Sequence, residues 1–147
     1  MENIKKLYQD ITVIVIDDDQ EITDFLTTLL KTDIHQIVIS YDGRSGLEKT
    51  RKYVPDLILL NVNLPDINGI EICRILKSDE LTKNIPIIMI TGRTDLKTKE
   101  ECYKAGADDF ITKPFEITEL VNKVNNLLQN KLAQKSFKEQ YERIQPQ

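Results

Sequence analysis

The sequence predicts a single α/β domain built on a parallel sheet, and three observations support this prediction. Short apolar runs alternate five times with longer segments of helical periodicity along the 147 residues. The connecting segments are short, so successive strands are expected to run parallel and to be joined by right-handed helical crossovers. Four apolar runs end in a polar group, and the carboxyl ends of parallel strands meet at one sheet edge, where ligands bind.

The first half of the chain contains two strand–helix units. Thr12–Ile16 is a continuous apolar run, as expected for a strand buried on both faces. Apolar residues then recur at positions 22, 25, 26, 29 and 30, the spacing of an amphipathic helix. Asp18 or Asp19 precedes this helix as its expected N-cap. Gln36–Ser40 predicts the second strand, and a shorter helix is expected from about Arg44 to Tyr53.

The second half repeats the alternation. Strands are expected at Leu57–Leu60, Ile87–Ile90 and Phe110–Thr112, with helices at Gly69–Lys77 and Leu96–Lys104. A last helix begins near Glu116 and carries an apolar stripe, which loses its register at Lys131. We therefore expect a domain over residues 1–130 and a helical C-terminal extension or linker stub over residues 131–147.

Composition narrows the class of protein. A net charge of −4 and a pI near 5.1 argue against a nucleic-acid-binding surface, which is usually basic. Cys73 and Cys102 are too few for a disulfide framework, and both lie in helical patterns, which favours reduced packing residues. No apolar run reaches membrane-span length, and Met1–Asp10 lacks the apolar core of a signal peptide. The expectation is a cytoplasmic protein without membrane or nucleic-acid partners.

An acidic triplet, Asp17-Asp18-Asp19, directly follows the first strand. Adjacent carboxylates repel one another, and a hard cation such as Mg²⁺ relieves that repulsion. The alternative is a solvated turn that also caps the following helix. The polar residues at the ends of the other strands favour the metal site over the solvated turn.

Those strand ends carry matching polar groups: Thr91 after the fourth apolar run, and Lys113-Pro114 after the fifth. Together with Asp17 and Asp18, this constellation resembles the CheY-like receiver domain of two-component response regulators. The resemblance covers roughly residues 10 to 130. It implies a flavodoxin-like, doubly wound, five-stranded parallel sheet of order 2-1-3-4-5, an order that alternation alone does not provide.

The resemblance also implies a role for each matching residue. Asp17, Asp18 and the main-chain carbonyl of Asn63 would hold Mg²⁺. Thr91 would donate a hydrogen bond to a phosphoryl oxygen, and Lys113 would pair with the acidic cluster or with the phosphoryl group. Phe110 occupies an aromatic switch position, although a half-buried strand aromatic explains it as well. A cis peptide is implied before Pro114.

Asn61 departs from the family, because it stands where the resemblance places the phosphoacceptor aspartate. A carboxylate is an anionic nucleophile, whereas a carboxamide is neutral and a poor one. We therefore expect no phosphorylation of this chain. The amide oxygen remains a weak metal ligand, so Mg²⁺ binding is expected to weaken without vanishing. The encoding gene decides whether Asn61 is natural or introduced.

The implied partners are a histidine kinase or phosphotransfer protein and a downstream effector or output domain. A weak homodimer is expected through the fourth helix, fifth strand and fifth helix, which correspond to Leu96–Lys104, Phe110 and Glu116–Leu127. We expect a non-enzymatic signalling module. Two alternatives are a phosphorylation-independent interaction module and a haloacid-dehalogenase-like phosphohydrolase using Asp17-x-Asp19. In that phosphohydrolase family, a Thr or Val usually stands at the position of Glu21.

Overall fold

A computed structural model describes residues 10–92 and 95–144, apart from the side chains of residues 135–139, 141 and 144. Residues 1–9 and 145–147 lie outside this description. The expected lack of a signal peptide and the end of the expected extension concern these residues. Over the described residues the strands form one five-stranded parallel sheet in the order β2-β1-β3-β4-β5, which confirms the expected order. The strands are β1 (Thr12–Ile16), β2 (Gln36–Ser40), β3 (Leu57–Asn61), β4 (Ile87–Thr91) and β5 (Asp109–Thr112).

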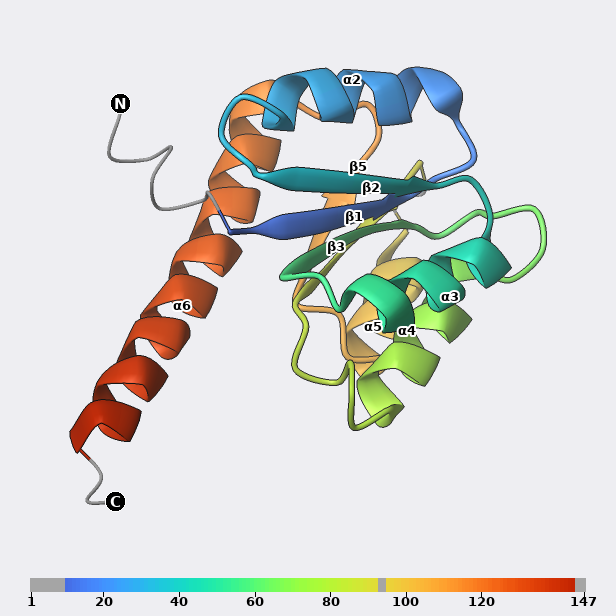
Figure 1. Ribbon diagram of the computed structural model, residues 1–147. Helices are drawn as coiled ribbons and strands as arrows, with labels where there is room; N and C mark the ends of the chain where they lie inside the picture. Colours follow the sequence, from blue (N-terminus) through green and yellow to red (C-terminus); the bar gives the residue numbers. More distant parts are fainter. Residues whose placement is uncertain (1–9, 93–94, 145–147) are drawn as a thin grey trace.

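The helices cover both faces of this sheet (Figure 1), as a doubly wound fold requires. On one face lie α2 (Gln20–Leu30) and α6 (Ile117–Ile144), and on the other lie α3 (Gly43–Tyr53), α4 (Gly69–Ser78) and α5 (Leu96–Lys104). No helix in the described part of the chain is long and apolar enough to cross a membrane.

The side chains of each central strand alternate between two hydrophobic cores. Val13 and Val15 pack into the core with α2 and α6, whereas Ile14 and Ile16 pack into the core with α4 and α5. Strand β3 divides in the same way, with Leu57 and Leu59 on one side and Ile58 and Leu60 on the other. Because both faces are covered, these strands are apolar at every position, which explains the continuous runs in the sequence.

Several elements extend one residue beyond their expected limits. Strands β3 and β4 include Asn61 and Thr91, because the main-chain ladder continues past the last apolar side chain and Val62 N–H donates to the Ile90 carbonyl at 2.9 Å. Asp19 is the N-cap of α2, since its carboxylate accepts hydrogen bonds from the main-chain N–H groups of Glu21 and Ile22. The side chain of Asp18 does not cap the helix, and it lies at the carboxyl edge of the sheet near Asn61.

Helix α6 is continuous from Ile117 to Ile144, so no helix end marks the expected boundary between residues 130 and 131. Its first half is anchored by Leu120, Val124 and Leu128, which are buried against the sheet. At 1.5 Å per residue its 28 residues span about 42 Å, and Figure 1 shows the helix running well past the sheet. The division into domain and extension stays a prediction.

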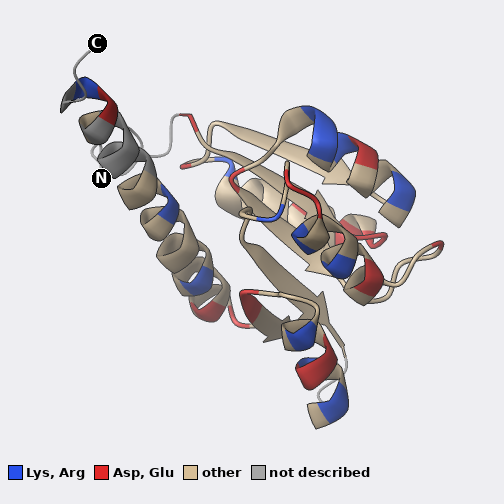
Figure 2. Cartoon of the chain, turned by 90° about the horizontal axis from the view of Figure 1, so that it is seen from below, with Lys and Arg blue, Asp and Glu red and all other residues tan. Residues whose placement is uncertain are grey.

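The two cysteines are buried and unpaired, as predicted for packing residues. Loss of hydration raises the pKa of each thiol to about 11, so both are neutral at physiological pH. In the view of Figure 2, the helices carry Lys and Arg interspersed with Asp and Glu rather than a continuous basic face.

Candidate functional site

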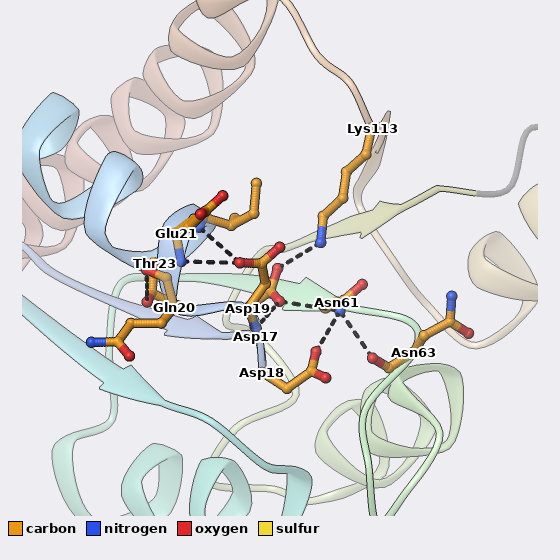
Figure 3. A network of polar contacts seen from close by, with 10 residues as sticks. Asp17, Asp18, Asp19, Gln20, Glu21, Thr23, Asn61, Asn63 and Lys113 are labelled. Atoms are coloured by element: carbon orange, nitrogen blue, oxygen red, sulfur yellow. Dashed lines mark hydrogen bonds and ion pairs between the residues drawn. The ribbon is translucent and has the colours of Figure 1, made fainter.

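Asp17 and Asp18 follow β1 at the carboxyl edge of the sheet, but their surroundings differ. Asp17 is fully buried, with an exposed fraction of 0%, whereas Asp18 lies at the surface. Burying a carboxylate is costly unless hydrogen bonds or an opposite charge compensate for the lost water. The neighbours of Asp17 supply both, as Figure 3 shows.

Lys113 supplies the opposite charge. Its Nζ lies 2.9 Å from Asp17 Oδ2, although the two residues are 96 positions apart in the chain. The other oxygen, Asp17 Oδ1, accepts a hydrogen bond of 2.9 Å from the main-chain N–H of Asp19. Lys113 follows β5, so its side chain reaches toward β1 across the ends of the strands between them. The Lys113–Pro114 peptide is cis, as the resemblance implied.

Asn61, the last residue of β3, joins the acidic side chains to the loop that follows it. Its Nδ2 donates to Asp17 Oδ1 at 3.2 Å, to Asp18 Oδ1 at 3.3 Å and to the Asn63 main-chain carbonyl at 3.0 Å. Asn61 is buried, so little water competes for these bonds. The structure thus brings Asp17, Asp18, Asn61, Asn63 and Lys113 into one polar network (Figure 3).

The two expected switch residues, Thr91 and Phe110, lie on β4 and β5. Thr91 ends β4 at the same edge and is fully buried, and its carbonyl accepts a hydrogen bond of 2.7 Å from Lys113 N–H. Phe110 pairs with Met89 in the sheet and is buried in the core that also contains Cys102. A half-buried aromatic was the alternative for Phe110, and the side chain is more buried than that. The switch roles of both residues stay predictions.

The oxygen atoms around Asn61 have the chemistry of a magnesium site. Two carboxylate oxygens and one main-chain carbonyl converge on a single point, and hard cations prefer oxygen ligands. That point is held by the amide nitrogen of Asn61, which is not a metal ligand. The residues therefore fit Mg²⁺ once the amide turns its oxygen inward. Within residues 10–92 and 95–144, no three His, Cys, Asp or Glu side chains lie together in a way that could hold a metal ion. The fit to Mg²⁺ therefore depends on two carboxylates together with the Asn63 carbonyl and the Asn61 amide.

Gly69 sets the path of the loop after β3. A Cβ atom at this position would lie 2.1 Å from the main-chain oxygen of Asn61, so only glycine permits the approach. Gly69 N–H also donates to the Val62 carbonyl at 2.7 Å, and Asn68 caps α4. Sequence reasoning missed this contact between Gly69 and Asn61, because no short-range pattern indicates it.

Asp66 ties the same loop to α3, a role that sequence reasoning missed. Its carboxylate accepts hydrogen bonds from the main-chain N–H groups of Gly43 at 2.7 Å and Arg44 at 2.9 Å, at the start of the helix. These bonds hold the pKa of Asp66 below the ordinary value of an aspartate, and the bond from Gly43 has the largest effect. The partners are more than 20 positions away, so no short-range pattern announces the contact.

Sequence comparisons relate the chain to proteins of known family. A family model described as the response regulator receiver domain matches residues 13–125. The response regulator ArlR of Staphylococcus saprophyticus subsp. saprophyticus is 40% identical over 116 residues, which make up 79% of this chain and 51% of that protein. ArlR of Staphylococcus aureus strain Mu50 is 38% identical over the same length. The chain thus spans about half the length of these curated relatives.

Solved structures agree with the sequence comparison. A putative response regulator from Chloroflexus aurantiacus superposes with a TM-score of 0.75 at 34% identity, covering 80% of this chain and 96% of that one. The BeF3-activated receiver domain of DrrB superposes with a TM-score of 0.74 at 29% identity, covering 80% of this chain and 97% of that one.

We predict that Gly69→Ala destabilises the protein by about 3 kcal/mol, because the added methyl group collides with the rigid main chain of Asn61. Gly92→Ala is the matched control, since a Cβ there meets nothing within 4 Å, and its effect should stay within about 0.5 kcal/mol. Urea unfolding measures both. Equal effects of the two variants would contradict the close approach.

Asp66 should make stability depend on pH. Its folded-state pKa is lowered, so its stabilising bonds to α3 are fully present above the ordinary carboxyl range and are lost as pH falls through the folded-state pKa. Asp66→Ala should therefore lose more stability relative to wild type at about pH 7 than at about pH 2. Asp66→Asn keeps an acceptor oxygen without the titration. Parallel unfolding curves at the two pH values, with an unchanged gap between wild type and Asp66→Ala, would refute the assignment.

Proposed function

The chain belongs to the response regulator receiver family, and on that premise we propose that it is a two-component signalling receiver that does not accept a phosphoryl group. The proposal rests on Asn61. It lies at the end of β3, within hydrogen-bonding distance of both Asp17 and Asp18, where the family resemblance calls for the acceptor aspartate. A carboxamide there has no anionic oxygen with which to attack phosphorus.

The remaining polar residues keep the roles that the resemblance implies. Lys113 is close enough to the acidic pair to bind a phosphoryl oxygen as well, and Thr91 ends the neighbouring strand at the same edge. Their presence supports a chain that has lost the acceptor while keeping its surroundings. Phosphorylation would therefore fail at the chemical step.

We further propose that Mg²⁺ binds through Asp17, Asp18 and the Asn63 carbonyl, with Asn61 as a weak fourth ligand. The convergence of three oxygen atoms on one point supports this site. When bound, the cation would offset the charge of the two carboxylates. A carboxamide supplies one negative charge less than a carboxylate, so binding is weaker than with aspartate at position 61.

The proposed partners follow from the family. They are a histidine kinase or phosphotransfer protein and a downstream effector or output domain, in a cytoplasmic setting. A weak homodimer would use the face formed by α5, β5 and α6, where Leu96, Tyr103 and Ile117 are exposed. Without a functioning acceptor, the chain acts as a phosphorylation-independent interaction module. The phosphohydrolase alternative loses support, because the Asp19 carboxylate is engaged in capping α2.

Incubation with acetyl phosphate and Mg²⁺ should leave this chain unmodified, and Asn61→Asp should gain one phosphoryl group as an acyl phosphate. The reason is that the variant supplies an anionic oxygen next to Asp17, which itself pairs with Lys113. Intact-mass spectrometry measures the adduct, and Asn61→Ala is the inert control. A phosphorylated wild-type chain, or an Asn61→Asp variant that never reacts, would refute the proposed function.

Mg²⁺ should bind Asn61→Asp about tenfold more tightly than wild type, or roughly 1.4 kcal/mol, because the variant adds a carboxylate ligand. Isothermal calorimetry or NMR titration measures the affinity, since the chain has no tryptophan for fluorescence. Asp18→Asn in the Asn61→Asp background should reverse the gain. Equal affinities of wild type and Asn61→Asp would contradict the role given to position 61.

A further inference from the structure

The hydrogen bonds of Asn61 share a feature that the proposed function does not use. All three partners of its Nδ2, the carboxylate oxygens of Asp17 and Asp18 and the carbonyl of Asn63, are acceptors without a proton to donate. Asn61 is 5% exposed, so its N–H donors have little access to water as an alternative acceptor. Two N–H bonds thus serve three converging oxygens.

The chemistry of these neighbours decides which way the amide points. If its oxygen faced inward, four oxygen atoms would crowd together without a proton or cation between them. With the nitrogen inward, the partial positive charge of the N–H groups lies where the negative charges converge. A divalent cation would occupy the same place, but it requires the amide oxygen as a ligand. The inward nitrogen and a bound cation therefore exclude each other.

We propose that the Asn61 carboxamide is a built-in replacement for the divalent cation, holding the acidic pair and the turn to Asn63 in place without metal. This inference rests on the proposed function, since it explains how a receiver lacking its acceptor keeps an ordered site. Metal binding then requires the amide to turn over and to give up three hydrogen bonds. Without a bound cation, the amide keeps the acidic pair and the turn to Asn63 in their places.

The charges at the site agree with this role. Asp17 is compensated on Oδ2 by Lys113 and on Oδ1 by Asp19 N–H and Asn61. An aspartate at position 61 would add a third carboxylate next to Asp17 and Asp18 and would take away the N–H donors. Like charges in a poorly hydrated place are unfavourable, so that variant needs a cation where wild type does not.

Thermal unfolding of the full chain in EDTA and in millimolar MgCl₂ tests the proposal. In EDTA, Asn61→Asp should melt roughly 5 °C or more below wild type, and Mg²⁺ should remove most of that gap while moving wild type little. Asn61→Ala, which loses the donors without gaining charge, should also melt lower in EDTA and respond to Mg²⁺. Asn84→Ala, at an exposed asparagine before β4 that does not belong to the network, serves as the matched control, with wild-type behaviour expected.

NMR of the wild-type chain provides a second measurement that does not depend on a variant folding. The side-chain NH₂ protons of Asn61 should exchange with solvent much more slowly than those of exposed Asn63, and saturating Mg²⁺ should shift them and speed their exchange. Fast exchange in EDTA, or an Asn61→Asp variant as stable as wild type in EDTA, would overturn the proposal. An equal loss of stability in every Asn61 variant with and without Mg²⁺ would also overturn it, because Asn61 would then only fill space.

These outcomes are separate from the test of the proposed function. An Asn61→Asp variant that depends on Mg²⁺ for stability but is never phosphorylated supports the cation replacement and refutes the missing-acceptor argument. If that variant is phosphorylated but the Asn61 protons of wild type exchange fast, the missing-acceptor argument is supported and the cation replacement is refuted.

Discussion

Asp17 is a carboxylate with no surface exposed to water, and the polar groups at this edge of the sheet are arranged around it. Its two oxygens accept from Lys113 on one side and from Asp19 N–H and Asn61 on the other. A buried carboxylate without such partners would cost several kcal/mol. The strand ends of β1, β3 and β5 are therefore linked through one side chain, and each of them depends on the others for its position.

The main chain beyond β3 is held as firmly as the side chains. Gly69 lies directly against the carbonyl of Asn61, and Asp66 joins the same loop to the start of α3. The carbonyl of Asn63, which takes part in the network of Asn61, belongs to this loop. The position of that carbonyl thus follows from contacts with two helices, neither of which carries an acidic residue of the site.

An exchange between asparagine and aspartate at position 61 illustrates how little of the fold depends on the chemistry of one polar residue. The two cores, on either side of the sheet, are built from apolar residues, and Asn61 belongs to neither of them. An amide is nearly the same size and shape as a carboxylate, so the change alters charge and hydrogen bonding but not packing. A fold of this kind supports interaction surfaces regardless of whether its site reacts, because function belongs to the site and not to the fold.

The sequence alone was sufficient to predict the strands, the helices, the two-sided burial of the sheet and the edge at which polar residues gather. These features follow from short-range periodicity, which the chain displays continuously from Thr12 onward. The strand order needed the family resemblance, because alternation is compatible with more than one order. The candidate site residues were also named by resemblance, which implied the pairing of Lys113 with the acidic cluster, but not their other contacts. The Asp66 bonds cross more than 20 positions, and the direction of the Asn61 amide depends on three acceptors from two different segments. Only the tertiary structure decides such contacts, because strand order and the path of each loop, rather than any local pattern, bring these atoms within hydrogen-bonding distance.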